Sequence, residues 1–285
     1  TGKTNDTALA AISADVPAGG KLWADGTKPC PMWGDIGTKT INETAAIKDI
    51  ALLRMVARVD VVIPAAVTNF KLASVHVYNY NTHGALVANA AAAISNGKVT
   101  YPTVPAASTL TEGPILYDGA AINTTSNQSV REIYIMESEN HTDNHTKAKD
   151  LLKRTCLVIG GTYGTDGKTS YYRVDFSTGS GTSQAFLDVL RNHKYTVNIT
   201  GVSGSGYEDA ETAFKSGPVN IEAGIIVWDA GNMGTTKFDG QNILSVSQDA
   251  FSFSREAKTG EESDNVLYVK TDYETDEAAT TGWRI

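Results

Sequence analysis

The sequence predicts an all-β protein built as two antiparallel β-sandwich domains. Three observations predict this class: apolar residues alternate with polar ones in several segments, turn-forming pairs such as Asp166-Gly167 separate these segments, and strands do not alternate with helices. A chain of 285 residues, of which 41% are hydrophobic and 20% charged, is long enough for two domains with cores of their own.

The clearest strand pattern runs from Leu53 to Ile63. Every second residue of this segment is apolar, and Arg54, Arg58 and Asp60 lie between them. Strict alternation is typical of a half-buried strand and does not fit the 3.6-residue period of a helix. The same reasoning predicts strands at 171–176, 195–199, 221–227, 251–253 and 266–268, and segments 70–79 and 131–137 are rich in β-forming Val, Ile and Tyr.

Segment 155–163 is a continuous apolar run that includes Gly160-Gly161, which favours a strand covered on both faces. The Asp166-Gly167 pair that follows predicts a hairpin to the strand at 171–176, with glycine supplying the positive φ of the turn. One short helix is expected over 183–193, where Ser183 is a candidate cap. The Ala-rich segment 88–94 fits either a helical turn or an ordered loop.

The polar stretch 137–150 is the predicted domain boundary, so the two domains are expected at 1–140 and 141–285. His141, Asp143 and His145 lie in this stretch at a spacing that metal ligands use. Because the segment is rich in Asn, Thr and Asp, the interpretation we favour is a solvated interdomain linker, and no metal site is predicted.

Composition excludes several classes of protein. The formal net charge is −8, and the 24 Lys and Arg residues are spread along the chain, so there is no basic face for nucleic acid. Two cysteines are too few for a disulfide framework or a structural zinc site, and Cys156, within an apolar run, is expected to be a buried thiol. No apolar stretch approaches the ~20 residues that span a bilayer, and no signal peptide is present.

No motif for catalysis or cofactor binding stands out. His76 and His193 lack a neighbouring nucleophile motif in the sequence. The glycine-rich segment 201–206 lacks the Lys-Ser/Thr that completes a phosphate-binding loop, so a flexible loop is expected there. We therefore predict that the protein is not an enzyme and that it has no catalytic, cofactor-binding or metal-binding residues.

Several of these segments resemble the fimbrillin family of Bacteroidetes, the fimbrial subunits and related fimbrillin-like proteins. The resemblance covers roughly residues 30–285. Its most specific part is the Tyr-Tyr-Arg-Val-Asp-Phe block at 171–176 followed by Arg-Asn-His-Lys-Tyr at 191–195. The other matching segments are 30–34, 53–61, 70–79, 134–137 and 159–163.

This resemblance implies two transthyretin-like Greek-key sandwiches and a role in building a bacterial surface pilus. Members of the family are exported as lipoproteins, and a protease removes an amino-terminal segment. A strand from a neighbouring subunit then fills the groove that this removal opens. The implied partners are identical or homologous fimbrial subunits, with the membrane contacted only through the precursor's lipid anchor. The implied location is the outer-membrane surface, and the implied role is adhesion and biofilm formation.

The amino-terminal region departs from the pattern of a full-length precursor. It contains no lipobox cysteine, and the region before Cys30 is short and polar. The first sandwich is therefore expected to lack its amino-terminal strand or strands and to act as an acceptor. Natural processing and trimming of the chain both remain open as the cause.

The candidate donor strand is the carboxy-terminal segment. Residues 265–273 read as a strand that includes Val266, Leu267, Tyr268 and Val269, and residues 274–277 form an acidic linker. Trp283 and Ile285 then place two apolar residues near the end of the chain. The alternative interpretation, which the sequence leaves equally open, is that 265–273 is simply the last strand of the second domain.

The alternative function is a tip adhesin or a surface glycan-binding module, with a host, bacterial or glycan receptor. Tryptophan rings stack on sugars, and Trp23 and Trp283 are the candidates for such contacts, whereas core packing is favoured for Trp33 and Trp228. The sequence does not distinguish a stalk subunit from a tip or anchor subunit.

Overall fold

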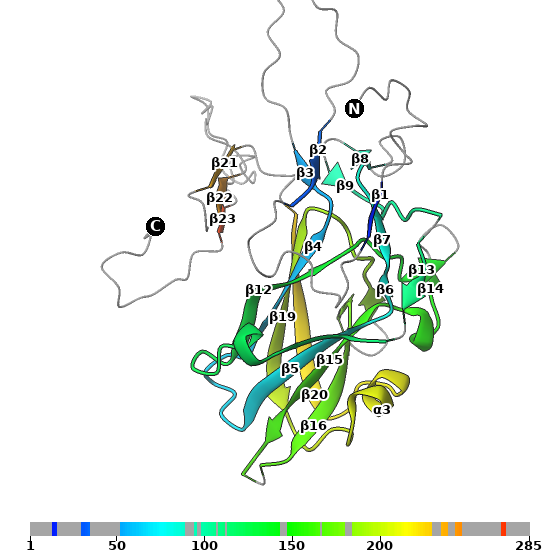
Figure 1. Cartoon of the computed structure of the whole chain (residues 1–285). Helices are drawn as coiled ribbons and strands as arrows, with labels where there is room; N and C mark the ends of the chain where they lie inside the picture. Colours follow the sequence, from blue (N-terminus) through cyan, green and yellow to red (C-terminus); the bar gives the residue numbers. More distant parts are fainter. Residues whose placement is uncertain are drawn as a thin grey trace, which may run out of the picture. The chain divides into compact units, whose positions relative to one another are not determined.

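The computed structural model describes residues 13–15, 30–34, 52–88, 94–95, 98–106, 108–111, 113–142, 147–165, 167–179, 184–229, 235–238, 243–246 and 269–271. The chain forms two compact units, Thr1–Asp229 and Ala230–Ile285, which are considered separately below. Strands are the main regular structure of the described residues, which otherwise contain one short α-helix, two 3₁₀ turns and connecting loops, so the predicted all-β class is confirmed (Figure 1).

The first unit contains two four-stranded sheets. One sheet has the order β11-β5-β15-β16 and the other β12-β4-β19-β20. All neighbouring strands in them are antiparallel except β4 and β19, which run parallel. The strands of the two sheets are β4 (Ala57–Val62), β5 (Phe70–Tyr78), β11 (Ile115–Asp118), β12 (Gln128–Ile135), β15 (Cys156–Tyr163), β16 (Thr169–Asp175), β19 (His193–Val202) and β20 (Ile221–Asp229).

Both sheets take strands from either side of residue 140, so the described strands do not separate at the predicted boundary. Val75 of β5 pairs with Ile159 of β15, and Val59 of β4 pairs with Tyr195 of β19. Apolar side chains from both halves therefore share one core, and the first compact unit continues to Asp229. Local periodicity identifies a strand but carries no information about which distant strand it pairs with, so a polar stretch between strands does not by itself mark a domain boundary.

The core of the sandwich follows the alternation expected from the sequence. Along β4, Ala57, Val59 and Val61 are fully buried, as the pattern at 53–63 predicts, although bends at residues 55 and 56 divide the predicted strand and Asp60 is buried as well. β16 and β19 contribute buried residues in the same way, which confirms the strands predicted at 171–176 and 195–199. The continuous apolar run at 155–163 is β15, which is buried on both faces over its first six residues, also as predicted.

Gly160 and Gly161 allow β15 to lie closely between its neighbours. A Cβ atom at Gly161 would overlap the ring of Phe70, and one at Gly160 would overlap Oγ of Ser74. The register between β15 and β5 shifts by a bulge between these two glycines. Beyond β15, residues Thr162 and Thr169 pair across the predicted hairpin to β16, where Gly167 has a positive φ of 70°.

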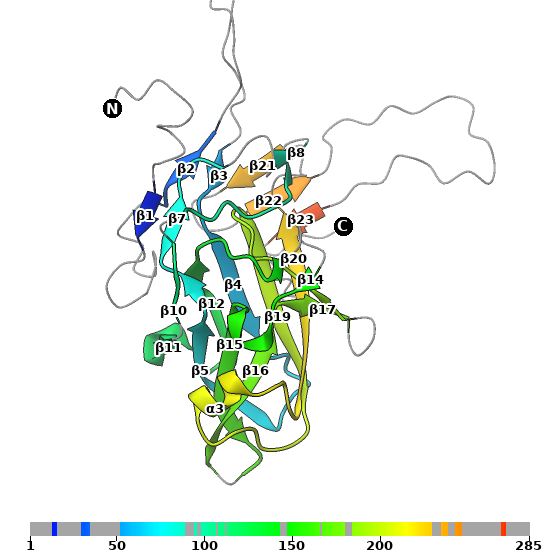
Figure 2. The same ribbon diagram turned by 90° about the vertical axis from the view of Figure 1, so that its right-hand side faces the viewer.

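The helix lies elsewhere than predicted. Within 184–193 the structure has β18 (Ala185–Phe186) and a bridge between Val189 and Ser138, because the backbone groups of this segment pair with neighbouring strands. The α-helix is α3 (Ala210–Lys215), whose cap residue Asp209 accepts a 2.7 Å hydrogen bond from the Thr212 amide. Figures 1 and 2 show α3 beside β15 and β16, where the Phe214 ring stacks on Tyr78 with centroids 4.4 Å apart.

The described first part of the polar stretch, residues 137–141, is packed against the sandwich rather than solvated. Glu137, Ser138 and Asn140 are buried, and β13 (His141–Thr142) pairs with β14 (Lys147–Ala148). The linker interpretation was therefore wrong for the described part of this segment. Its polar residues are buried because each has hydrogen-bond partners inside the protein, which composition alone does not reveal.

Short strands and turns complete the described residues of the first unit. β1 pairs with β7, β2 with β3, β6 with β10, β8 with β9 and β17 with β18. Their bounds are β1 (Ser13–Asp15), β2 (Met32–Trp33), β3 (Leu53–Arg54), β6 (Tyr80–Asn81), β7 (His83–Ala85), β8 (Ile94–Ser95), β9 (Lys98–Val99), β10 (Leu110–Thr111) and β17 (Ser177–Thr178), and the 3₁₀ turns are η1 (Gly119–Ala121) and η2 (Leu151–Lys153).

The second unit contains a three-stranded antiparallel sheet. Its strands are β21 (Thr235–Phe238), β22 (Ile243–Val246) and β23 (Val269–Thr271), in that order across the sheet. The predicted strands at 251–253 and 266–268, and most of the Ala-rich segment 88–94, lie outside the described residues. Within the described part of the chain, no helix combines the length and apolar character needed to cross a membrane.

Candidate functional site

The most prominent surface feature of the sandwich is the outer edge of β20. This strand is nine residues long and pairs with β19 along one edge, while no described strand pairs with its other edge. Two of its apolar side chains are open to solvent, Ile226 at 51% and Val227 at 36%. Unpaired backbone groups beside exposed apolar side chains are the features that allow another strand to add to a sheet.

Val227 shows that the exposure reaches the core side of the sheet. It pairs with Tyr195, and Ile225 pairs with Val197; both partners belong to the hydrophobic core. Side chains opposite each other on neighbouring strands share a face, so Val227 points towards the core row although a third of it remains exposed. The core is therefore incompletely covered along β20.

The other long edge of the sandwich, along β16, is closed by the glycine-rich loop. The backbones of Tyr171 and Tyr207 exchange two hydrogen bonds of 2.9 Å, and the Tyr172 hydroxyl donates to the carbonyl of Gly204. A Cβ at Gly206 would overlap the Tyr171 carbonyl, so glycine is required for this approach. Of the segment 201–206, expected to be a flexible loop, Gly201 and Val202 end β19, and the residues after them lie against the edge of β16 near Tyr171 and Tyr172.

The two remaining edges are short or irregular. β11 has four residues, and β12 is interrupted by a register shift near Arg131, whose φ is 66°. Short strands and bulges weaken an edge as a template for pairing. β20 is therefore the long, regular edge that the described residues leave without a strand partner.

A buried ion pair fastens one end of the sandwich. Arg191 Nε donates to Glu137 Oε2 at 2.8 Å, and its Nη2 lies 2.6 Å from the same oxygen. The guanidinium also donates to the carbonyls of Leu86 and Ala85, and Glu137 accepts from the backbone amides of Arg191 and Thr103. Burial raises the pKa of Glu137, with Arg191 opposing the rise. Both side chains are almost fully buried and bind four separate segments of the chain together, which indicates a structural role.

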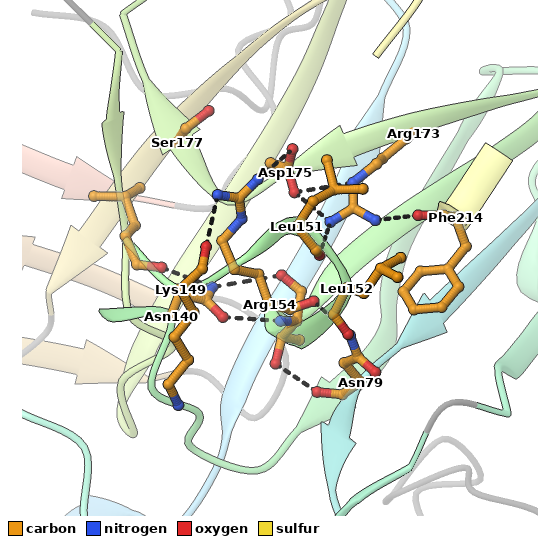
Figure 3. Close-up of polar contacts among 12 residues, drawn as sticks. Asn79, Asn140, Lys149, Leu151, Leu152, Arg154, Arg173, Asp175, Ser177 and Phe214 are labelled. Carbon is orange, nitrogen blue, oxygen red and sulfur yellow. Dashed lines mark hydrogen bonds and ion pairs between the residues drawn. The ribbon is translucent and has the colours of Figure 1, made fainter. Parts of the chain in front are cut away.

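A second buried cluster joins β15, β16 and α3 (Figure 3). Asp175 accepts hydrogen bonds from Arg173 at 3.1 and 2.8 Å, and Arg154 lies 3.6 Å from its other oxygen. Nearby, Asn79 donates to the carbonyls of Leu152 and Arg154 at 2.7 and 3.0 Å. These contacts hold η2 against the end of β5.

Asn140 fixes the strand entry at β15. Its side chain accepts a 2.8 Å hydrogen bond from the Thr155 amide and donates to the Leu187 carbonyl at 2.9 Å. Its own amide donates to Asp188 Oδ1 at 2.7 Å, and that oxygen also lies 2.9 Å from His141 Nδ1. His141 therefore pairs with a carboxylate from another segment.

The metal-like spacing at 141–145 is not realised in what the structure describes. Asp143 and His145 lie outside the described residues. Among the described residues, no group of three or more His, Cys, Asp or Glu is arranged to hold a metal ion.

A hydroxyl–imidazole pair on β5 was missed in the sequence, although its two members at i and i+2 on one predicted strand were the available signal. Ser74 Oγ lies 3.1 Å from His76 Nε2. The other ring nitrogen, Nδ1, is buried without a hydrogen-bond partner, so no carboxylate orients the imidazole as in a catalytic triad. Burial lowers the pKa of His76, and Asp118 opposes the shift. His193, the second candidate, is buried and its Nδ1 lies 2.8 Å from the Arg191 carbonyl.

One of the six candidate donor residues lies in the described part of the chain. Val269 is in β23 and pairs with Val246 of β22. This pairing is within the chain, as the alternative interpretation expects, and it does not test donation to another copy. Val266, Leu267, Tyr268, Trp283 and Ile285 lie outside the described residues.

The remaining sequence candidates are placed as follows. Trp33 is half-buried in β2, and Trp228 lies in β20 opposite Lys194, whereas Trp23 lies outside the described residues. Both cysteines are free thiols, and burial raises the pKa of Cys156 to about 12. The buried charges at Glu137, Arg173 and Arg191 were not predicted; Arg173 and Asp175 at i and i+2 on one strand were the available signal.

No protein-family model and no curated protein matches this sequence. Solved structures of similar fold include a "putative cell adhesion protein" from Bacteroides eggerthii, 16% identical over 80% of this chain and 72% of its own, with a TM-score of 0.47. A second structure of the same description, from Bacteroides uniformis, is 13% identical over 80% and 69% of the two chains, with a TM-score of 0.41.

The third similar structure is a tip fimbrial protein from Porphyromonas gingivalis with a carboxy-terminal truncation. It is 17% identical over 62% of this chain, with a TM-score of 0.34. This chain spans about half of that protein, 52% of its length.

Proposed function

We propose that this chain is a structural subunit of a bacterial surface fimbria that polymerises by accepting a β-strand from a neighbouring copy. Adhesion and biofilm formation at the outer-membrane surface follow from that role. The observation that carries the proposal is the open edge of β20, with its exposed apolar residues Ile226 and Val227. The sequence resemblance to fimbrillins supports the same role.

A strand laid along β20 would have two favourable effects. Its backbone would pair with the outer N–H and C=O groups of β20, which no described strand bonds. Its alternate side chains would cover Val227 and the adjoining core, and burying apolar surface contributes about 25 cal/mol per Å².

The proposed donor is the carboxy-terminal segment 265–273 of another copy, with Trp283 and Ile285 beyond it as further apolar contacts. The rival arrangement keeps this segment in its own chain, where β23 pairs with β22. Alternating apolar residues suit either arrangement, so the two are separated by experiment.

The test compares two variants by electron microscopy and sedimentation velocity. Deleting 265–285 is expected to leave a folded monomer that forms no filaments. Val227→Lys in β20 is expected to weaken assembly, and Leu116→Lys, at another exposed apolar position on the short edge strand β11, serves as the matched control. Filaments that persist after the deletion would exclude the donor assignment, and equal effects of the two lysine variants would exclude β20 as the acceptor.

A wild-type chain that stays monomeric and binds glycans would instead favour the adhesin alternative. A glycan array with Trp23→Ala and Trp283→Ala variants measures this directly.

A further inference from the structure

The buried cluster around Asp175 contains more positive than negative charge. Two guanidinium groups, those of Arg173 and Arg154, lie against this one carboxylate (Figure 3). The side chains of Arg173 and Asp175 are 0% and 4% exposed, and that of Arg154 is 10% exposed. One positive charge therefore remains uncompensated at the surface end of the cluster.

Arg173 is fully engaged and does not account for this excess. Its Nε and Nη2 donate to Asp175 Oδ1, Nη2 also donates to the Leu151 carbonyl at 2.8 Å, and Nη1 donates to the Phe214 carbonyl. The better hydrogen bonds of Asp175 are thus used by Arg173, and its second oxygen reaches Arg154 only at 3.6 Å.

Arg154 is held in place but not satisfied. A guanidinium carries five N–H donors, and the hydrogen bond that Arg154 makes within the described part of the chain runs from Nη1 to the Lys149 carbonyl at 3.0 Å. Its Nε is buried and has no hydrogen-bond partner. The Phe186 ring covers one face of the group, with 3.9 Å between Cζ and the ring centroid. The side chain is therefore fixed in position, and the described residues leave several of its donors without a hydrogen-bond partner.

The charged neighbours leave this excess in place. Asp150 is exposed and stabilises the charge of Arg154 only weakly, because it is the smallest of the electrostatic influences on this group and makes no direct ion pair with it among the described residues. Glu139 lies 3.7 Å from the Lys149 ammonium group, so its charge is already compensated. Lys153 adds a further exposed positive charge next to Arg154 in η2. The planar fork of a guanidinium matches the two oxygens of a carboxylate.

We propose that Arg154 is the anchor for a carboxylate side chain of a second copy of this chain. This inference rests on the proposed function, in which copies assemble. Each copy has a net charge of −8, with 32 Asp and Glu against 24 Lys and Arg, so copies repel one another unless a local cationic site offsets the repulsion. The exposed Leu152 beside Arg154 supplies apolar contact for a protein partner.

The experiment has two arms and uses the full chain. The first measures the thermal unfolding midpoint in succinate against chloride at equal ionic strength, since a ligand that binds the folded state raises it. The second measures self-association by sedimentation velocity. The variants are Arg154→Gln, Arg154→Lys and the matched control Lys153→Gln, which removes the same charge from the neighbouring exposed position. Near-ultraviolet circular dichroism checks that each variant folds.

Loss of a charge-assisted hydrogen bond is expected to weaken self-association of Arg154→Gln about tenfold and to abolish the succinate response, with Lys153→Gln unchanged. Arg154→Lys keeps the charge without the fork and is expected to fall between them. If succinate raises the unfolding midpoint of Arg154→Gln as much as that of the unmodified chain, Arg154 is not the carboxylate anchor. If Arg154→Gln loses this rise but self-associates as before, a second copy of the chain is not the occupant. If filaments form normally with Arg154→Gln but are lost on deleting 265–285, the role of Arg154 as an anchor is overturned and the proposed strand donation is not. If filaments persist after the deletion but are lost with Arg154→Gln, only the assignment of 265–273 as the donor strand is overturned.

Discussion

Replacing Arg191 with methionine tests how the buried ion pair stabilises the sandwich. The substitution keeps an unbranched apolar stem but removes the charge that faces Glu137, together with the donors to the carbonyls of Ala85 and Leu86. Glu137 keeps two backbone donors, from Arg191 and Thr103. Removing one partner of a buried pair leaves an uncompensated charge, so we expect a loss of about 3–5 kcal/mol in the free energy of unfolding.

The pH dependence of this variant carries a definite sign. Burial already raises the pKa of Glu137, and removing Arg191 takes away the main opposing influence. A carboxyl whose pKa is higher in the folded state binds more protons there, so stability rises as pH falls through the folded pKa towards the unfolded one. Arg191→Met is therefore expected to be least stable above neutral pH and to recover part of its loss at about pH 5, within the range where carboxyl groups titrate.

The assay is urea denaturation followed by circular dichroism at several pH values. Adding Glu137→Gln to Arg191→Met should recover about 2 kcal/mol at neutral pH, because the stranded charge is removed. A loss below about 1 kcal/mol, which is the scale of an exposed ion pair, would refute the reasoning. So would a loss that is independent of pH, or a double variant no more stable than the single one.

Three other predictions follow from burial and packing. Gly160→Ala, whose added Cβ crowds Ser74, is expected to lower the free energy of unfolding by about 1–3 kcal/mol. Gly224→Ala in β20, where the added Cβ meets open space, should leave it unchanged or raise it slightly. Urea denaturation of both variants measures the difference. Burial lowers the pKa of His76, so the unfolded state binds the proton of this imidazole more readily than the folded state does. Part of the free energy of unfolding should therefore be lost as pH falls through about 6.5, and His76→Gln should lose less over that range in the same assay. Cys156 has a pKa raised to about 12 and no exposed surface, so it should resist maleimide in the native protein while Cys30 reacts. Labelling of Cys156 in the native protein, detected by mass spectrometry, would contradict this prediction.

Local patterns in the sequence predicted the strands well. The alternation at 53–63 and 195–199 depends only on which side chains face the core, and β4 and β19 follow it. The hairpin at Asp166-Gly167 likewise depends on neighbouring residues, and β15 and β16 pair across it.

Partners distant in sequence were not predictable in this way. The burial of Glu137 and Asn140 depends on Arg191, Thr155 and Leu187, which are remote in the chain, so the stretch looked like a solvated linker. The helix at 183–193 failed for the same reason, since Val189 pairs with Ser138. The edge of β20 and the surroundings of Arg154 also depend on how segments distant in sequence are placed, which the described residues show and local patterns do not.

The parallel pairing of β4 with β19 sets the order in which this sandwich can fold. β4 ends at Val62, and its central partner β19 begins only at His193, so a growing chain exposes one side of β4 until most of the first unit has been made. Closing such a long loop is entropically costly, and folds dominated by distant pairings form slowly. The chain should therefore stay unfolded, and dependent on protection from aggregation, until synthesis has passed β19.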